Sequence, residues 1–123
     1  MEMTKPTVEP IQGDEPTDLV ITDLGVGEGQ EAVPGTDVTV HYVGVAHSTG
    51  EQFDASWDRA QPLQFRLGGG QVIQGWDKGV AGMKVGGRRR LEIPPHLAYG
   101  RNGKGGIKPN ETLIFIVDLL GVN

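Results

Sequence analysis

Trp76 offers the largest apolar surface in a stretch of chain that is otherwise thinly covered with side chains. It lies in residues 72–80, which read Val-Ile-Gln-Gly-Trp-Asp-Lys-Gly-Val. A tryptophan in this setting either packs into the core or forms the floor of an apolar pocket that receives a ligand. The remaining residue types decide which chemistry such a pocket could support.

Other combinations of reactive residues lack the spacing that their chemistry needs. Cysteine is absent, which excludes a thiol nucleophile and a disulfide. The three histidines do not have the spacing of a metal site. Gly68–Gly70 lacks the Lys-Ser/Thr pair of a phosphate-binding loop. Asp54 and Asp58 could form a carboxylate pair, but charges at this spacing are usually solvated. We therefore expect neither a metal nor a cofactor, and the candidates that remain are aromatic residues and one acid.

The segment around Trp76 has helical periodicity. Its apolar residues recur at spacings of three and four: Ile73, Trp76, Val80 and Met83. Three glycines at i, i+4 and i+7 share the segment: Gly75, Gly79 and Gly82. Each costs about 1 kcal/mol relative to alanine inside a helix. This pattern predicts a short helix whose bare glycine stripe lies against a sheet.

The rest of the chain reads as strands separated by glycine- and proline-containing turns. Residues 38–43 and 63–67 alternate between apolar and polar positions, and so does the segment 88–93. The segment 19–24 is short and apolar, while 113–120 is apolar on both faces, as expected of a central strand. We predict an α+β fold in which a twisted antiparallel β-sheet of about five to six strands packs on one short α-helix.

Charge divides the chain unevenly. The formal net charge is −5 over 123 residues, and the first 31 residues hold eight acids against one base, Lys5. This argues against nucleic acid or an anionic membrane as the main partner. No apolar run approaches the roughly 20 residues of a membrane span.

Residues 1–17 are acidic and contain three prolines, so we expect a flexible N-terminal extension followed by one domain over 18–123. The start lacks a signal-peptide pattern, which predicts a cytoplasmic protein, although a secreted form with its signal removed would look the same.

Five segments, in order and spread over the folded body, resemble the FKBP-type peptidyl-prolyl isomerases, the immunophilin family that binds rapamycin and tacrolimus. They are Val40–Gly44, Phe53–Ser56, Val72–Trp76, Ala98–Gly100 and Leu113–Phe115. The resemblance extends from about Leu19 to Val122. It implies a half-barrel sheet wrapped around the helix, with a pocket between them. It also implies a monomeric enzyme that isomerises Xaa-Pro bonds in proline-containing polypeptides during protein folding.

The resemblance also implies roles for individual residues. Trp76 would form the pocket floor, and Asp54, Tyr99 and Trp76 would be the catalytic residues. The substrate-binding set would comprise Tyr42, Phe53, Asp54, Arg59, Leu63, Val72, Ile73, Trp76, Tyr99, Ile107 and Phe115. We expect the Tyr99 hydroxyl and the Ile73 N–H to donate to substrate carbonyls, and the Asp54 carboxylate to be held by Tyr42 and Arg59. Two alternatives remain open: Asp54 as a purely structural acid, and Tyr99 as a packing residue of its loop.

The sequence departs from the commonest family pattern at the pocket wall. Leu63 stands where phenylalanine is frequent, and Lys104 and Lys108 lie in the loop over the pocket. These differences bear on substrate preference and on affinity for macrolide inhibitors. Two other function classes stay open: a proline-binding, chaperone-like module without catalysis, and a scaffold that works through its acidic extension.

Overall fold

The computed structural model describes residues 4–123, so the first three residues of the predicted extension lie outside the described residues. Six strands form one antiparallel sheet. They are β1 (Val20–Gly25), β2 (Asp37–Ala46), β3 (Gln52–Ala55), β4 (Leu63–Arg66), β5 (Arg88–Ile93) and β6 (Leu113–Val122). One α-helix, α1 (Gln74–Gly79), and two 3-10 helices, η1 (Ser56–Arg59) and η2 (Pro95–Leu97), complete the fold. The predicted α+β class and strand number are confirmed.

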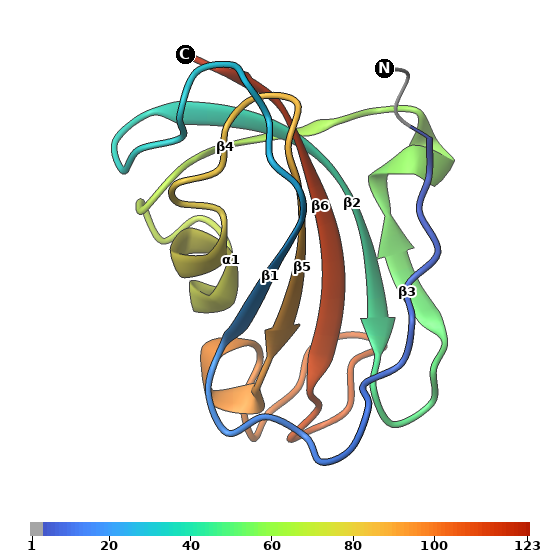
Figure 1. Ribbon diagram of the computed structural model, residues 1–123. Coiled ribbons are helices and arrows are strands. Elements are labelled where there is room, and N and C mark those ends of the chain that lie inside the picture. Colours follow the sequence, from blue (N-terminus) through green and yellow to red (C-terminus); the bar gives the residue numbers. More distant parts are fainter. Residues whose placement is uncertain (1–3) are drawn as a thin grey trace.

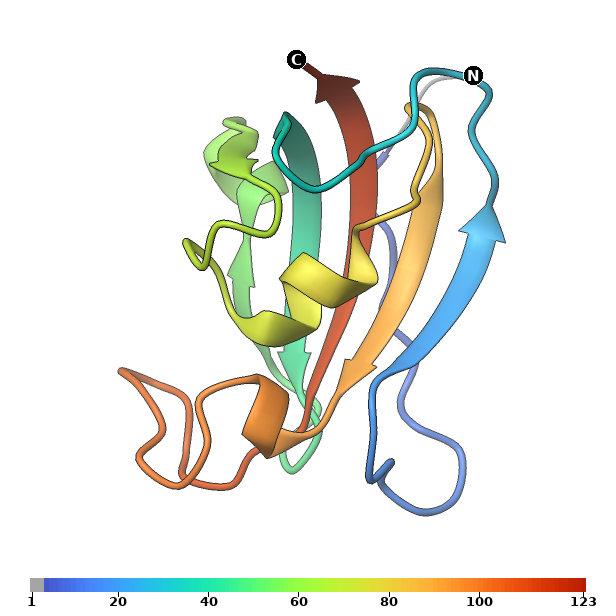
Figure 2. The same ribbon diagram turned by 90° about the vertical axis from the view of Figure 1, so that its left-hand side faces the viewer.

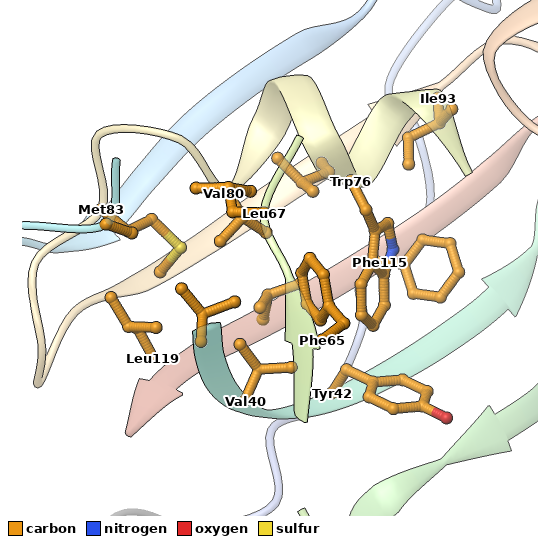
Figure 3. Close-up of a cluster of buried hydrophobic side chains, with 14 of the residues drawn as sticks. Val40, Tyr42, Phe65, Leu67, Trp76, Val80, Met83, Ile93, Phe115 and Leu119 are labelled. Carbon is orange, nitrogen blue, oxygen red and sulfur yellow. The ribbon is translucent and has the colours of Figure 1, made fainter. Parts of the chain in front are cut away.

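The sheet curves around α1, which lies on its concave side (Figures 1 and 2). The strand order is β1-β5-β6-β2-β3, and β4 pairs with β2 beside β3. β6 is therefore central, and its residues from Leu113 to Leu119 are all buried, as its two apolar faces predict. The concave face and the helix enclose the core, part of which is drawn in Figure 3.

Two glycines of α1 allow the helix to lie directly on the sheet. A β-carbon on Gly75 would lie 2.5 Å from Cγ2 of Ile93, and one on Gly79 would lie 2.7 Å from Cδ2 of Leu91. Both partners belong to β5, so the predicted contact between glycines and sheet is present. Gly82 differs from the prediction, because it lies beyond the helix with φ of +89°. That left-handed conformation suits glycine and ends helical geometry before Met83.

Arg89 fastens the end of this short helix to the sheet. Its Nη1 donates to the carbonyl oxygens of Gly79 (3.0 Å) and Ala81 (2.8 Å), and its Nε lies 2.6 Å from Oδ1 of Asp23. The side chain is largely buried, and its charge is matched by the helix C-terminus and one carboxylate. A six-residue helix is too short to be stable alone, so these tertiary contacts hold it in place.

Residues 4–19 cross the convex side of the sheet, opposite α1 (Figure 2). They contain neither helix nor strand. Arg88 donates to the Thr4 carbonyl (2.8 Å), Arg90 to the Glu9 carbonyl (2.6 Å), and the Thr112 hydroxyl to Glu15 (2.7 Å). The flexibility of the extension and its boundary with a domain over 18–123 stay predictions. Within residues 4–123, no helix has both the length and the apolar character needed to cross a membrane.

Candidate functional site

A pocket of about 150 Å³ opens between α1 and the concave face of the sheet. Its lining draws on β2, β3, β4, β6, α1, the turn before α1 and the loop after η2. The lining residues are Tyr42, Phe53, Asp54, Leu63, Gln71, Val72, Ile73, Trp76, Tyr99 and Phe115. The fold thus brings nine of the eleven predicted substrate-binding residues to one cavity.

Trp76 lies at the base of this pocket and is only 4% exposed. Its ring packs edge-on against Tyr42 (4.9 Å between centroids) and Phe115 (5.2 Å). Phe65 packs on it at 5.7 Å from the side of the core (Figure 3). Edge-to-face aromatic pairs at these separations fix ring orientation. The indole therefore presents a rigid apolar floor.

Asp54 lies at the rim, in a triangle with Tyr42 and Arg59. The Tyr42 hydroxyl donates to Oδ2 of Asp54 at 2.6 Å. Arg59 donates from Nη1 to Oδ1 of Asp54 at 2.5 Å and from Nη2 to the Tyr42 oxygen at 2.8 Å. Antiparallel pairing of β2 with β3 brings Tyr42 near Asp54, and η1 follows β3 directly, which returns Arg59 to the same place.

The triangle fixes the charge of its members. Burial by itself raises the pKa of Asp54, but the hydrogen bonds from Tyr42 and Arg59 outweigh it and hold that pKa below its usual value. Burial, followed by the hydrogen bond to Asp54, raises the pKa of Tyr42. The rim therefore carries an ionised carboxylate and a neutral phenol at neutral pH.

Besides the buried indole N–H of Trp76, two hydrogen-bond donors of the pocket lining have no protein acceptor in the described residues. Tyr99 lies in the loop after η2; burial and the nearby Asp54 charge raise its pKa, and no group within residues 4–123 hydrogen-bonds to its hydroxyl. Ile73 precedes α1, and its N–H likewise donates to no acceptor in the described part of the chain. Such donors can form hydrogen bonds to the carbonyl oxygen of a bound ligand.

Two predicted residues lie outside the pocket lining, and one lining residue is absent from the prediction. Arg59 is hydrogen-bonded to Asp54 but does not itself line the pocket. Ile107 lines an adjoining hollow with Phe53, Asp54 and Tyr99. Gln71 lines the pocket while its Oε1 accepts the Arg66 N–H at 2.8 Å. Its place directly before Val72 was the only available signal.

Comparison with known proteins identifies the family. Residues 28–120 match the model of the FKBP-type peptidyl-prolyl cis-trans isomerases. The chain belongs to this family. An FK506-binding protein of Streptomyces anulatus is 61% identical over 124 residues, covering 99% of this chain and all of the relative. An FK506-binding protein of Neisseria meningitidis serogroup B is 55% identical over 105 residues, covering 85% of this chain and 95% of the relative.

Solved FKBP structures agree with the fold. A crystal structure of AtFKBP13 superposes with a TM-score of 0.80 at 41% identity, covering 89% of this chain and 96% of that one. FkpA from Escherichia coli gives the same TM-score and identity, covering 97% of this chain and 53% of that one. The family resemblance noted in the sequence is confirmed, and with it the enzyme class: a peptidyl-prolyl cis-trans isomerase.

Proposed function

We propose that this FKBP isomerises Xaa-Pro bonds by enclosing the proline ring in the pocket over Trp76 and stabilising the twisted amide. The observation that carries the proposal is the combination of a rigid apolar floor with two donors that have no protein acceptor. Isomerisation makes and breaks no covalent bond, so it needs neither a nucleophile nor a metal. It needs a site that fits the transition state better than the planar amide.

The physical basis is a difference in polarity. The planar amide is stabilised by resonance, and the barrier to rotation is about 18–20 kcal/mol. At the twisted transition state resonance is lost and the carbonyl becomes less dipolar, so an apolar pocket disfavours it less than the ground state. A thousandfold acceleration requires only about 4 kcal/mol of this differential stabilisation.

We assign the polar groups to orientation. The Tyr99 hydroxyl and the Ile73 N–H donate to carbonyl oxygens of the substrate on either side of the proline pocket. Asp54 acts electrostatically on the rotating carbonyl and not as a general base, because its carboxylate is occupied by Tyr42 and Arg59. Its lowered pKa also makes it a poor proton acceptor at neutral pH.

The same pocket is proposed to bind rapamycin- and tacrolimus-type macrolides. Relatives at 55–61% identity are named FK506-binding proteins, and the aromatic pocket offers such ligands a concave apolar surface. A role in protein folding, a cytoplasmic location and a monomeric state stay predictions. Cell fractionation and sedimentation velocity would test the last two.

A proline-binding module without turnover is the second candidate. A domain that only binds has no need of the charged triangle at the rim, whereas this chain retains Asp54 together with Trp76, Tyr99 and Phe115 around one cavity. The scaffold hypothesis predicts instead that deletion of residues 1–17 abolishes function.

The test is cis–trans exchange of a short Xaa-Pro peptide, measured by NMR with and without rapamycin. We expect the protein to accelerate exchange and rapamycin to abolish the acceleration. Peptide or macrolide binding without acceleration would favour the binding module, and the absence of both binding and acceleration would refute the assigned site.

A further inference from the structure

The loop between η2 and β6 places a second hollow directly beside the proline pocket. This hollow has a volume of about 230 Å³ and is lined by Phe53, Asp54, Tyr99, Lys104, Gly106 and Ile107. It shares Phe53, Asp54 and Tyr99 with the main pocket, so the two adjoin. An extended peptide advances by about 3.3–3.6 Å per residue. A substrate with its proline over Trp76 can therefore place a residue adjacent to that proline in the hollow.

The loop has a charge opposite to that of the whole protein. Residues 98–110 contain Arg101, Lys104 and Lys108 and no acid, although the chain as a whole carries −5. All three side chains are exposed. None forms an ion pair with any group in residues 4–123. Their charges are thus available to a ligand.

Of these three cations, only Lys104 lines the hollow. A tight turn fixes its backbone: Lys104 N–H donates to the Ile107 carbonyl at 3.0 Å, and Ile107 N–H donates back at 2.8 Å. Gly103 and Gly105 adopt positive φ on either side of Lys104. Its ammonium lies 5.8 Å from the ring centroid of Tyr99, within range of a cation–π interaction. The cation is therefore held above the tyrosine whose hydroxyl faces the main pocket.

Asp54, the acid in the same hollow, is not a counter-ion for Lys104. Asp54 is paired with Arg59 at 2.5 Å and accepts the Tyr42 hydroxyl. Lys104 is consequently the charge in the hollow that lacks a counter-ion among the described residues. We propose that Lys104 forms a cationic subsite that selects Xaa-Pro segments carrying Asp or Glu next to the proline. This inference rests on the proposed function, because it assumes that the proline occupies the pocket over Trp76.

The test compares peptides that differ only in charge. Two matched pairs carry Glu or Gln, one pair immediately before proline and the other immediately after it. For the wild-type protein we expect kcat/KM to favour Glu by about three- to fivefold in at least one pair, the range of a single exposed ion pair. The preference should shrink between about 20 mM and 0.5 M NaCl, because salt screens exposed charges.

Three variants locate the effect. Lys104→Ala should bring the Glu/Gln ratio to about 1, and Lys104→Glu should bring it below 1, while circular dichroism checks that both fold. Lys108→Ala is the matched control, because it removes the same charge from the same loop but from a residue that does not line the hollow. A wild-type ratio near 1 in both pairs overturns the proposal. An equal loss of preference in Lys104→Ala and Lys108→Ala overturns it as well, since that would indicate diffuse charge and no subsite.

Binding separates this proposal from the proposed function. The Glu/Gln ratio of Kd, obtained by NMR titration of the same peptides, reports on the subsite whether or not turnover occurs. Absence of turnover with a Kd ratio that depends on Lys104 would refute isomerisation and support the subsite. Turnover of the peptides with Glu/Gln ratios of kcat/KM and Kd that are the same in the wild type and in Lys104→Ala would support isomerisation and refute the subsite.

Discussion

The Tyr42 hydroxyl donates a 2.6 Å hydrogen bond to Asp54 from the neighbouring strand, and Arg59 bonds to both partners. The same Tyr42 ring packs edge-on against Trp76 at 4.9 Å. One side chain thus joins the charged rim of the pocket to its apolar floor. A change at the rim can therefore be tested without disturbing the floor, provided that the ring of Tyr42 is kept.

Tyr42→Phe changes the hydrogen bonds at the rim while it keeps the ring that packs against the floor. The ring contacts remain, while Asp54 loses one of the two side-chain hydrogen bonds that lower its pKa. We expect a stability loss of about 1 kcal/mol, typical of one hydrogen bond. We expect kcat/KM to fall by about three- to tenfold, an effect of about 1 kcal/mol on the barrier. Urea unfolding and peptide isomerisation measure the two effects, and an unchanged kcat/KM would show that the triangle is only structural.

Tyr99→Phe tests the proposed donor to the substrate. The Tyr99 hydroxyl has no hydrogen-bond partner in the described residues, so its removal should leave the free energy of unfolding within about 0.5 kcal/mol of wild type. Loss of a substrate hydrogen bond should lower kcat/KM by about three- to tenfold. If Tyr99 is only a packing residue of its loop, kcat/KM will stay at the wild-type value, because phenylalanine preserves the packing.

The pH dependence follows from the directions of three pKa shifts. The pKa of Asp54 is lowered, whereas the pKa values of Tyr42 and Tyr99 are raised above the usual 10.0. None of these groups changes charge between about pH 5 and 9, so we expect kcat/KM for an uncharged peptide to be flat over that interval. Stopped-flow measurement of kcat/KM checks this. An inflection near pH 7 that persists with an uncharged peptide would contradict the assignment of roles.

Stability should respond to acid through the same carboxylate. Because the folded pKa of Asp54 is lowered, its contribution is present above the unfolded value of about 3.9 and is lost as pH falls through the folded value. The contribution is small, since the side chain is 37% exposed to solvent. Asp54→Asn should therefore flatten the acid limb of a plot of unfolding free energy against pH. The two curves should converge at low pH, and parallel curves would contradict the shift.

Trp76→Ala should combine loss of fold stability with loss of activity. The side chain is 4% exposed and contacts three aromatic rings, so truncation leaves a cavity and costs about 3–5 kcal/mol. Trp76→Leu fills part of that cavity and should cost less. Thermal unfolding ranks the three proteins. Equal melting temperatures for the two variants would mean that the pocket floor collapses in the alanine variant, leaving no cavity to fill.

Local periodicity was enough to predict five of the six strands. The short strand β3 was not among them, and the role of Trp76 as the pocket floor came from the family resemblance. Alternation in residues 38–43 predicts the buried face that contains Tyr42, and the double apolar face of 113–120 predicts the central strand. Helix length was not predictable in this way, since Met83 keeps helical spacing although the chain turns at Gly82. Turn conformation at that glycine overrides the periodicity.

Specific side-chain and turn contacts explain the positions of residues that periodicity could not predict. Gln71 enters the pocket lining because its side chain is anchored on the backbone of Arg66, a contact that leaves no periodic signal. Ile107 lies in the adjoining hollow because a turn pairs it with Lys104. The path of residues 4–19 depends on carbonyl groups that accept from Arg88 and Arg90, and any sequence of similar polarity could supply those.

Gly75→Ala reverses the usual effect of helix propensity. Alanine favours a helix over glycine by about 1 kcal/mol, which would predict stabilisation. Here the new β-carbon would lie 2.5–2.9 Å from three side-chain atoms of Ile93, which is fully buried. Overpacking of this kind costs about 1–3 kcal/mol. We therefore expect net destabilisation in urea unfolding.

A double-mutant cycle isolates the cause of that destabilisation. Ile93→Ala removes all three atoms that crowd the new β-carbon, so in its background Gly75→Ala should become stabilising, by up to about 1 kcal/mol. Gly25→Ala serves as the control, since no atom lies within 4 Å of its β-carbon position and its φ is not positive. Destabilisation by Gly75→Ala in both backgrounds would show that the helix itself, and not its contact with β5, resists the methyl group. A change of sign would establish that glycine is required at this position because the sheet lies directly against the helix that carries Trp76.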